Sequence, residues 1–186
     1  MRTMKKFELK RMIISALLLA LALVLPFLTG QIKQIGNMLL PMHLPVFLCS
    51  FICGPWYGLS VGVVAPLLRS ALFGMPHLYP NAVAMAFELA AYGFFADFIY
   101  RRMGAKGLRA LYTALLGSMV LGRVVWGVAE VVLLGLGGKT FTFGAFVAGA
   151  LTSAVLGIAL QLVLIPTIMT ALQRARVVPL EREKRS

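Results

Sequence analysis

Four ionisable side chains lie inside stretches that are otherwise apolar, and these residues are the first candidates for chemistry. They are two arginines and two glutamates: Arg69, Glu88, Arg123 and Glu130. A charge near the centre of a bilayer costs about 2.5–3.5 kcal/mol on insertion scales, so each should have a partner or water. Guanidinium groups and carboxylates in one place would bind a small polar ligand through charge-assisted hydrogen bonds. A further acid, Asp97, precedes Arg101 by four residues and is expected to pair with it instead.

Two helix faces, with the spacing i, i+3, i+4 and i+7, carry these charges together with aromatic and amide side chains. One face lies on the fourth apolar run and contains Glu88, and the other lies on the fifth and contains Arg123. The predicted substrate-binding residues are Arg69, His77, Tyr79, Asn81, Glu88, Tyr92, Arg123, Trp126, Glu130 and Thr152. The alternative is an internal set of salt bridges that holds three helices together, with water and without a ligand.

Motifs for catalysis do not occur in the sequence. There is no Gly-x4-Gly-Lys-Ser/Thr phosphate-binding loop, no Gly-x-Ser-x-Gly and no His-Glu-x-x-His. Cys49 and Cys53 stand four residues apart, but two sulfurs do not complete a structural metal site. His43 and His77 are both expected near the outer surface, away from any serine that they would activate. We therefore expect no catalytic residue, no metal, no cofactor and no enzymatic activity.

Long apolar runs must position the charged residues. Hydrophobic residues make up 60% of the 186 and the mean hydropathy is +0.90, which excludes an ordinary soluble domain. A bilayer core of roughly 30 Å is crossed by about 20 helical residues. Gly54-Pro55 divides an uncharged stretch that is too long for one span. The sequence predicts an all-α membrane protein with a basic N-terminus (1–11), six transmembrane helices and a charged tail (173–186), the helices being 12–29, 38–54, 56–74, 80–100, 109–136 and 143–172.

The positive charges predict the orientation of these helices. Of the 18 lysines and arginines, 14 lie at the N-terminus, at 101–109 and at the C-terminus. Because cytoplasmic loops carry the excess of positive charge, both termini and the 101–108 loop are expected in the cytoplasm. Five spans, with 38–74 as a re-entrant hairpin, would break this pattern. The net charge of +12 flanks apolar runs, so it fits the anionic headgroups of a lipid bilayer better than nucleic acid.

The stretch from Met42 to Ser70 is similar to a known family. It contains Met-His-Leu-Pro-Val-Phe (42–47), a Gly-Pro-Trp-Tyr-Gly turn (54–58) and Pro-Leu-Leu-Arg-Ser (66–70). With its six short spans and no ATP motif, the chain resembles the substrate-binding S-components of energy-coupling factor (ECF) vitamin transporters. Ala16 and Ala20 are similar to the small-x-x-x-small surface with which that family docks on its coupling subunit.

The resemblance implies the binding subunit of an ECF-type ABC importer in a prokaryotic plasma membrane. It would capture a small water-soluble vitamin or precursor from outside and deliver it inward with a coupling membrane subunit and two ATPase subunits. A carboxylate such as pantothenate would suit the arginines, and a vitamin B6 form would suit the aromatic side chains, so the ligand stays open. The alternatives are an autonomous small-solute transporter or channel, a membrane enzyme, and a structural membrane protein.

Overall fold

The computed structural model describes residues 2–29, 40–103, 107–138, 140, 142–148 and 155–175. Within these ranges the regular structure is helical and contains no strand, as the sequence predicts. In chain order its elements are α1 (Arg2–Val24), η1 (Leu25–Thr29), α3 (His43–Cys53), α4 (Pro55–Phe73), η2 (Leu78–Ala82), α5 (Val83–Arg102), α6 (Leu108–Leu136), α7 (Phe143–Val147) and α8 (Val155–Arg174). Thr152 and the tail beyond residue 175 lie outside the described residues.

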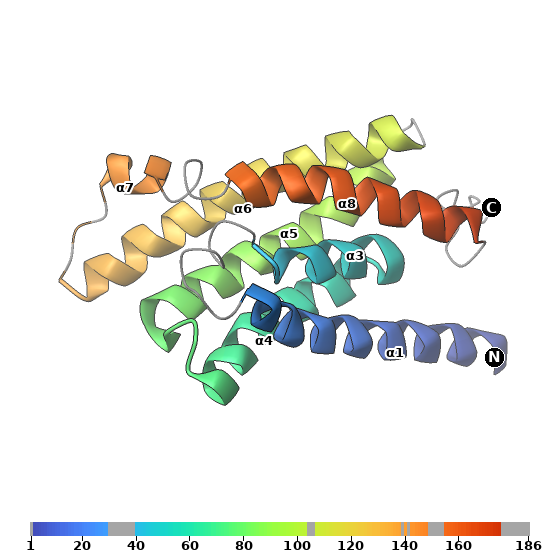
Figure 1. Cartoon of the computed structure of the whole chain (residues 1–186), viewed down its shortest axis with the longest axis horizontal. Coiled ribbons are helices and arrows are strands. Elements are labelled where there is room, and N and C mark those ends of the chain that lie inside the picture. Colours follow the sequence, from blue (N-terminus) through green and yellow to red (C-terminus); the bar gives the residue numbers. More distant parts are fainter. Residues whose placement is uncertain are drawn as a thin grey trace.

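Helix length separates α3 from its neighbours. Among the described residues, five helical segments are long and apolar enough to cross a membrane: those that contain α1, α4, α5, α6 and α8. By contrast, α3 is equally apolar but has only 11 residues. Its rise is therefore about 16 Å, roughly half of a bilayer core. Figure 1 shows α3 within the bundle formed by the longer helices.

The two ends of the bundle differ in charge. Figure 1 shows that the start of α1, the α3–α4 turn, the end of α5, the start of α6 and the end of α8 lie at one end of the molecule. The helix ends there carry Arg101, Arg102, Arg109 and Arg174. We call this the basic end, and we call the opposite end, where α4 connects to α5, the far end. Positive charge gathered at one end is the pattern that predicts a cytoplasmic position for it.

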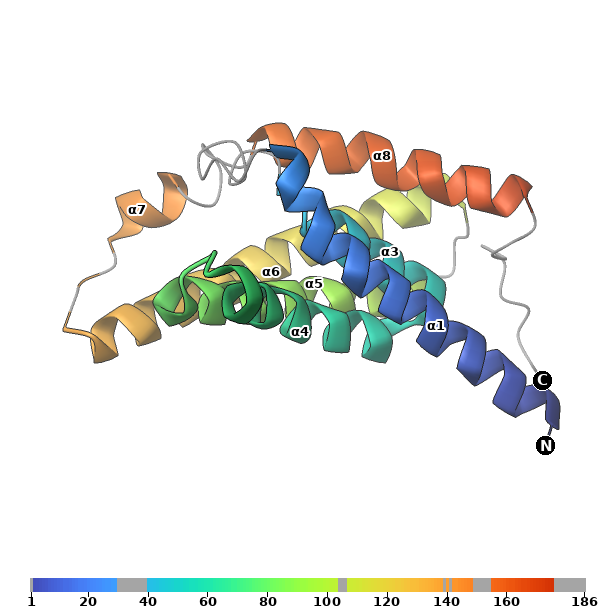
Figure 2. The same ribbon diagram turned by 60° about the horizontal axis from the view of Figure 1, so that its bottom comes forward.

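Glycines bring α4 and α5 into backbone contact. Gly58 and Gly62 stand four residues apart on α4. Gly93 of α5 lies opposite Gly58, and the backbone of Leu89 lies opposite Gly62. A Cβ atom on Gly58 would collide with the carbonyl oxygen of Gly93, and a Cβ atom on Gly93 with that of Gly58. Small residues at such spacing allow helices to approach closely in a membrane, where van der Waals contact drives association. Figure 2 shows α4 running beside α5.

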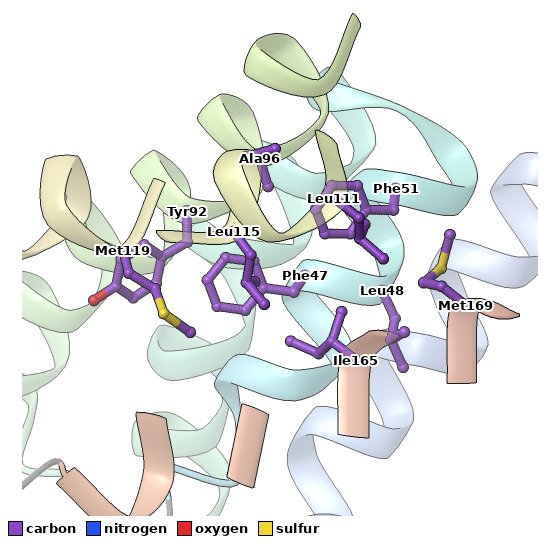
Figure 3. Packing of buried hydrophobic residues seen from close by; sticks show 11 residues of the cluster. Phe47, Leu48, Phe51, Tyr92, Ala96, Leu111, Leu115, Met119, Ile165 and Met169 are labelled. Carbon is purple, nitrogen blue, oxygen red and sulfur yellow. The ribbon is translucent and has the colours of Figure 1, made fainter. Parts of the chain in front are cut away.

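The core lies where α3, α5, α6 and α8 meet. Figure 3 shows side chains from all four helices facing one another, with Met119 beside Tyr92 and Ile165 near Phe47. The buried members of this cluster are Phe47, Leu48, Phe51, Tyr92, Ala96, Leu111, Ala114, Leu115, Met119, Ile165 and Met169. The cluster joins α8 to the rest of the bundle and leaves Tyr92 at the border between apolar packing and the polar groups described below.

A compact polar contact closes the basic end. The guanidinium of Arg101 donates to Asp97 Oδ2 at 2.5 Å, which confirms the expected i, i+4 pair. The backbone N–H of Asp97 donates to Ser50 Oγ at 3.1 Å, so the pair is tied to α3. Gly54, at φ 113°, forms the α3–α4 turn directly against Arg101, where a side chain would collide with the guanidinium. The turn and the pair therefore fit together as one unit.

Candidate ligand-binding site

Glu88 is the centre of the polar group inside the bundle. It lies on α5 and is 3% exposed. Its Oε1 atom accepts hydrogen bonds from Arg123 Nη1 at 2.8 Å and from the Tyr92 hydroxyl at 2.8 Å. His43 Nε2 lies 3.8 Å from the same oxygen. Three helices thus converge on one carboxylate, because Glu88 and Tyr92 come from α5, Arg123 from α6 and His43 from α3.

The position of Tyr92 follows from its neighbours. Its ring stacks on Phe47 at 5.1 Å between centroids, and the imidazole of His43 lies 5.4 Å away. Gly122 on α6 makes room for the ring, because a Cβ atom there would overlap with it. The ring is thus held between α3 and α6, with its hydroxyl directed at the preceding turn of α5, where Glu88 lies. The aromatic packing therefore sets the direction of a polar contact.

His43 is a residue of this group that the sequence interpretation missed. It was expected near the outer surface, but it is 1% exposed and lies beside Glu88. The reason is the length of α3, which starts at His43 and ends at Cys53. Counting back from the Gly54 turn at 1.5 Å per residue places His43 about 16 Å from the basic end, near the middle of a bilayer. That turn was the sequence signal that would have located it.

Several buried donors inside the bundle have no acceptor. Arg123 uses Nη1 for Glu88, while its Nε and Nη2 atoms are buried and make no hydrogen bond. Gln161 Nε2 on α8 is buried without an acceptor, and neither ring nitrogen of His43 makes a hydrogen bond. Gln161 is 2% exposed. Sequence analysis did not select Gln161, although an amide inside an apolar run is a signal of the same kind as a charge.

Aromatic rings and a second carboxylate continue the site along α6 toward the far end. Trp126 stacks on Phe146 of α7 at 6.0 Å, and Arg123 lies 6.0 Å from the indole centroid. Glu130, 8% exposed, lies one turn from Trp126 on the same face of α6. Gly127 lies against the Phe146 ring, where a Cβ atom would overlap with it. The predicted face of Arg123, Trp126 and Glu130 therefore lines one side of the polar group.

Arg69 lies apart from this group, so the four charges do not all meet as expected. Its Nη1 donates to the carbonyl oxygen of Leu23 at 2.6 Å. Its guanidinium also lies 5.0 Å from the ring centroid of Phe27 and 5.4 Å from that of Phe73. Arg69 therefore joins the end of α4 to the end of α1. The sequence did not reveal this because the direction in which a helix face points depends on its neighbours. A role for Arg69 in binding stays a prediction.

The remaining predicted residues lie nearer the far end. The Tyr79 hydroxyl donates to the carbonyl oxygen of Leu133, which ties the α4–α5 connection to α6. His77 is exposed and Asn81 is partly buried. On α1, Ala16 and Ala20 are both exposed, so no described part of the chain covers them. The described residues contain no group of three or more histidines, cysteines, aspartates or glutamates that would hold a metal ion.

The fold and the site define a multi-pass membrane protein with a polar, incompletely hydrogen-bonded group in its interior. Over residues 10–175 the chain matches the family described as "ECF transporter, substrate-specific component". The chain belongs to this family, whose members are membrane-embedded transport subunits that bind substrate and work with partners of an ECF module. No curated protein and no solved structure gave a match.

Proposed function

We propose that this subunit captures a small water-soluble vitamin or vitamin precursor from outside the cell and delivers it inward with an ATPase module. Pantothenate and a vitamin B6 form are the first compounds to test. The observation that carries the proposal is the group around Glu88, where two buried donors of Arg123 are left without acceptors inside a membrane domain. The buried Gln161 on α8 also has a donor without an acceptor. A ligand with hydrogen-bonding groups would complete them.

The exposed alanines of α1 support a partner at that surface. Ala16 and Ala20 stand one turn apart on a helix of which little is buried in the rest of the chain. Small side chains let another helix approach closely, so we propose that the coupling subunit of the ECF module packs on this stripe. The prokaryotic plasma membrane and the ATPase subunits belong to the same proposal.

Uptake into proteoliposomes tests the function. The first step identifies small molecules released from gently purified protein by mass spectrometry. Vesicles are then loaded with ATP and carry the subunit either alone or with a coupling subunit and two ATPase subunits. We expect uptake of the identified compound only with the complete module. Uptake by the subunit alone would instead establish an autonomous transporter.

A pair of tryptophan variants tests the docking surface. Ala16→Trp with Ala20→Trp should stop uptake by the complete module and leave binding of the compound unchanged, because both positions are exposed. Val163→Trp on α8, also exposed, is the matched control and should do neither. Equal loss of uptake in the control would remove the support for docking on α1.

A further inference from the structure

The unused donors of Arg123 lie on one edge of its guanidinium group. In arginine, the N–H groups of Nε and Nη2 point the same way and form a planar fork, whereas Nη1 points elsewhere. Arg123 directs Nη1 to Glu88 Oε1 and leaves both atoms of the fork buried and without a partner. The ion pair with Glu88 therefore occupies only part of the guanidinium. Two adjacent donors stay available for a group with two acceptors in one plane.

A contact that served only to hold the helices together would not leave this edge open. Buried donors without acceptors oppose folding, and those of charged groups do so more than neutral ones. Gln161 on α8 shows the same property independently. It lies on the buried face of α8 with Gly157 and Ile165, and Ile165 belongs to the core cluster that contains Tyr92. Gln161 is thus one turn from a residue of the core cluster that contains Tyr92, the hydrogen-bond partner of Glu88.

We infer, on the basis of the proposed function, that the ligand is a small carboxylate whose two oxygens bind side-on to the Nε–Nη2 edge of Arg123. Gln161 Nε2 supplies a further donor to the acceptor groups of the ligand. Arg123 then lies between two carboxylates, with Nη1 on Glu88 and the free edge on the ligand. Gln161 and Arg123 become residues that determine specificity.

The shape of the open edge favours a carboxylate over a carboxamide, and charge favours it over a phosphate. A neutral carboxamide offers only one oxygen to the fork, whereas a carboxylate offers two at matching spacing. A phosphate would bring close to two negative charges into a region that already holds Glu88 and Glu130. A carboxylate brings only one negative charge, and that charge lies directly against the guanidinium. The ligand therefore carries a single carboxylate.

Matched compounds that differ only at this group test the inference. Melting temperature and calorimetric affinity of the purified full chain are measured with three pairs: pantothenate and panthenol, biotin and biotinol, nicotinate and nicotinamide. We expect one carboxylate to bind at least about 100-fold more tightly than its neutral partner, because a site built for a hydrogen-bonding group rejects the analogue that lacks it. Arg123→Lys, which keeps the charge without the fork, should reduce that preference to less than about 10-fold.

Gln161→Met provides a second variant that does not depend on the ion pair. It replaces an unpaired amide by an apolar side chain of similar size, so the empty protein should melt at the same or a higher temperature. The same variant should bind the carboxylate about 5–10-fold more weakly. A merely structural glutamine would lower the melting temperature and leave the affinity unchanged.

The outcomes separate this inference from the proposed function. Equal binding of a neutral partner, or a preference that persists in Arg123→Lys, would overturn the carboxylate assignment and leave substrate capture standing. No binding in any pair would overturn the assignment and remove support from substrate capture as well.

Discussion

Two acids of α5 pair with arginines, and the two pairs differ in how completely they are hydrogen-bonded. Asp97 pairs with Arg101 at the basic end, and Glu88 pairs with Arg123 in the interior, and both acids are 3% exposed. The side chain of Arg101 is 43% exposed, so water reaches it, whereas that of Arg123 is 13% exposed. In addition, two of the guanidinium nitrogens of Arg123 have no acceptor.

Under the proposed function, this difference separates a structural pair from a pair that binds a ligand. At the basic end, Ser50 and the Gly54 turn complete the contacts, so the pair anchors α5 to α3. In the interior, His43 and Arg123 approach Glu88 from two other helices, and two donors of Arg123 have no acceptor. The same chemical groups therefore take different roles because their surroundings satisfy them to different degrees.

The largest expected effect follows from removing the charge of Glu88. Glu88→Gln leaves the buried guanidinium of Arg123 without its counter-charge, and breaking a buried ion pair costs about 3–5 kcal/mol. Denaturant unfolding in detergent micelles measures this loss. Asp97→Asn is the matched control, with an expected loss of about 1 kcal/mol because Arg101 can be solvated. Equal losses in the two variants would erase the distinction between the pairs.

A smaller effect is expected from crowding Tyr92. Gly122→Ala places a methyl group where the Tyr92 ring lies, and overpacking of this kind costs about 1–3 kcal/mol. The displaced hydroxyl no longer reaches Glu88, so ligand affinity should fall as well. Gly135→Ala on the same helix meets no atom within 4 Å and should be neutral or slightly stabilising. Thermal unfolding with and without ligand compares them. An unaffected Gly122→Ala would show that Tyr92 does not need its present position.

Removing only the hydroxyl of Tyr92 tests the polar contact without the packing. Tyr92→Phe keeps the stacking on Phe47 and loses one hydrogen bond to Glu88, with an expected cost of about 0.5–1.5 kcal/mol. Unfolding free energy and ligand affinity should both decrease, since Glu88 becomes less firmly oriented. Unchanged affinity in a destabilised variant would restrict Tyr92 to a structural role.

The smallest effect is expected at the partly exposed arginine. Arg101→Gln should cost about 0.5 kcal/mol, and this difference should shrink as salt is raised to about 1 M, where screening acts within about 3 Å. The loss in Glu88→Gln should stay nearly constant over the same range, because buried charges are screened much less. Unfolding at low and high salt gives both values. A salt-dependent loss at Glu88 would mean that solvent reaches the interior pair.

Much of the helical architecture could be predicted from the sequence. Hydrophobic length predicts the long helices, and the position of basic residues predicts that Arg101 and Arg174 lie at the same end as the start of α1. Glu88 and Arg123 could be selected because charges inside apolar runs need partners. These predictions succeed because they depend on depth along a helix, which counting residues gives directly.

The rest of the site depends on which neighbouring helix each side chain faces, and counting residues along one helix does not give that direction. Their depth along their helices would allow Arg69 and Glu88 to pair with each other, but Arg69 donates to the carbonyl oxygen of Leu23 on α1. A helix of ordinary span length would place His43 near the surface, whereas α3 has only 11 residues. The place of Tyr92 depends on the missing side chain of Gly122, a relation between two helices. Periodicity within one helix carries no information on such a relation.

The contact of Gly58 and Gly93 has a consequence for how such a chain would diversify. Any side chain at either position collides with the backbone of the opposite helix. Only glycine is therefore tolerated at these positions while the helices stay in contact. The contact therefore holds α5, which carries Glu88, in a fixed position against α4. New substrate preferences would arise on α6 and α8, where Arg123 and Gln161 lie. Substitutions that distinguish descendants with different cargo should therefore gather on those helices.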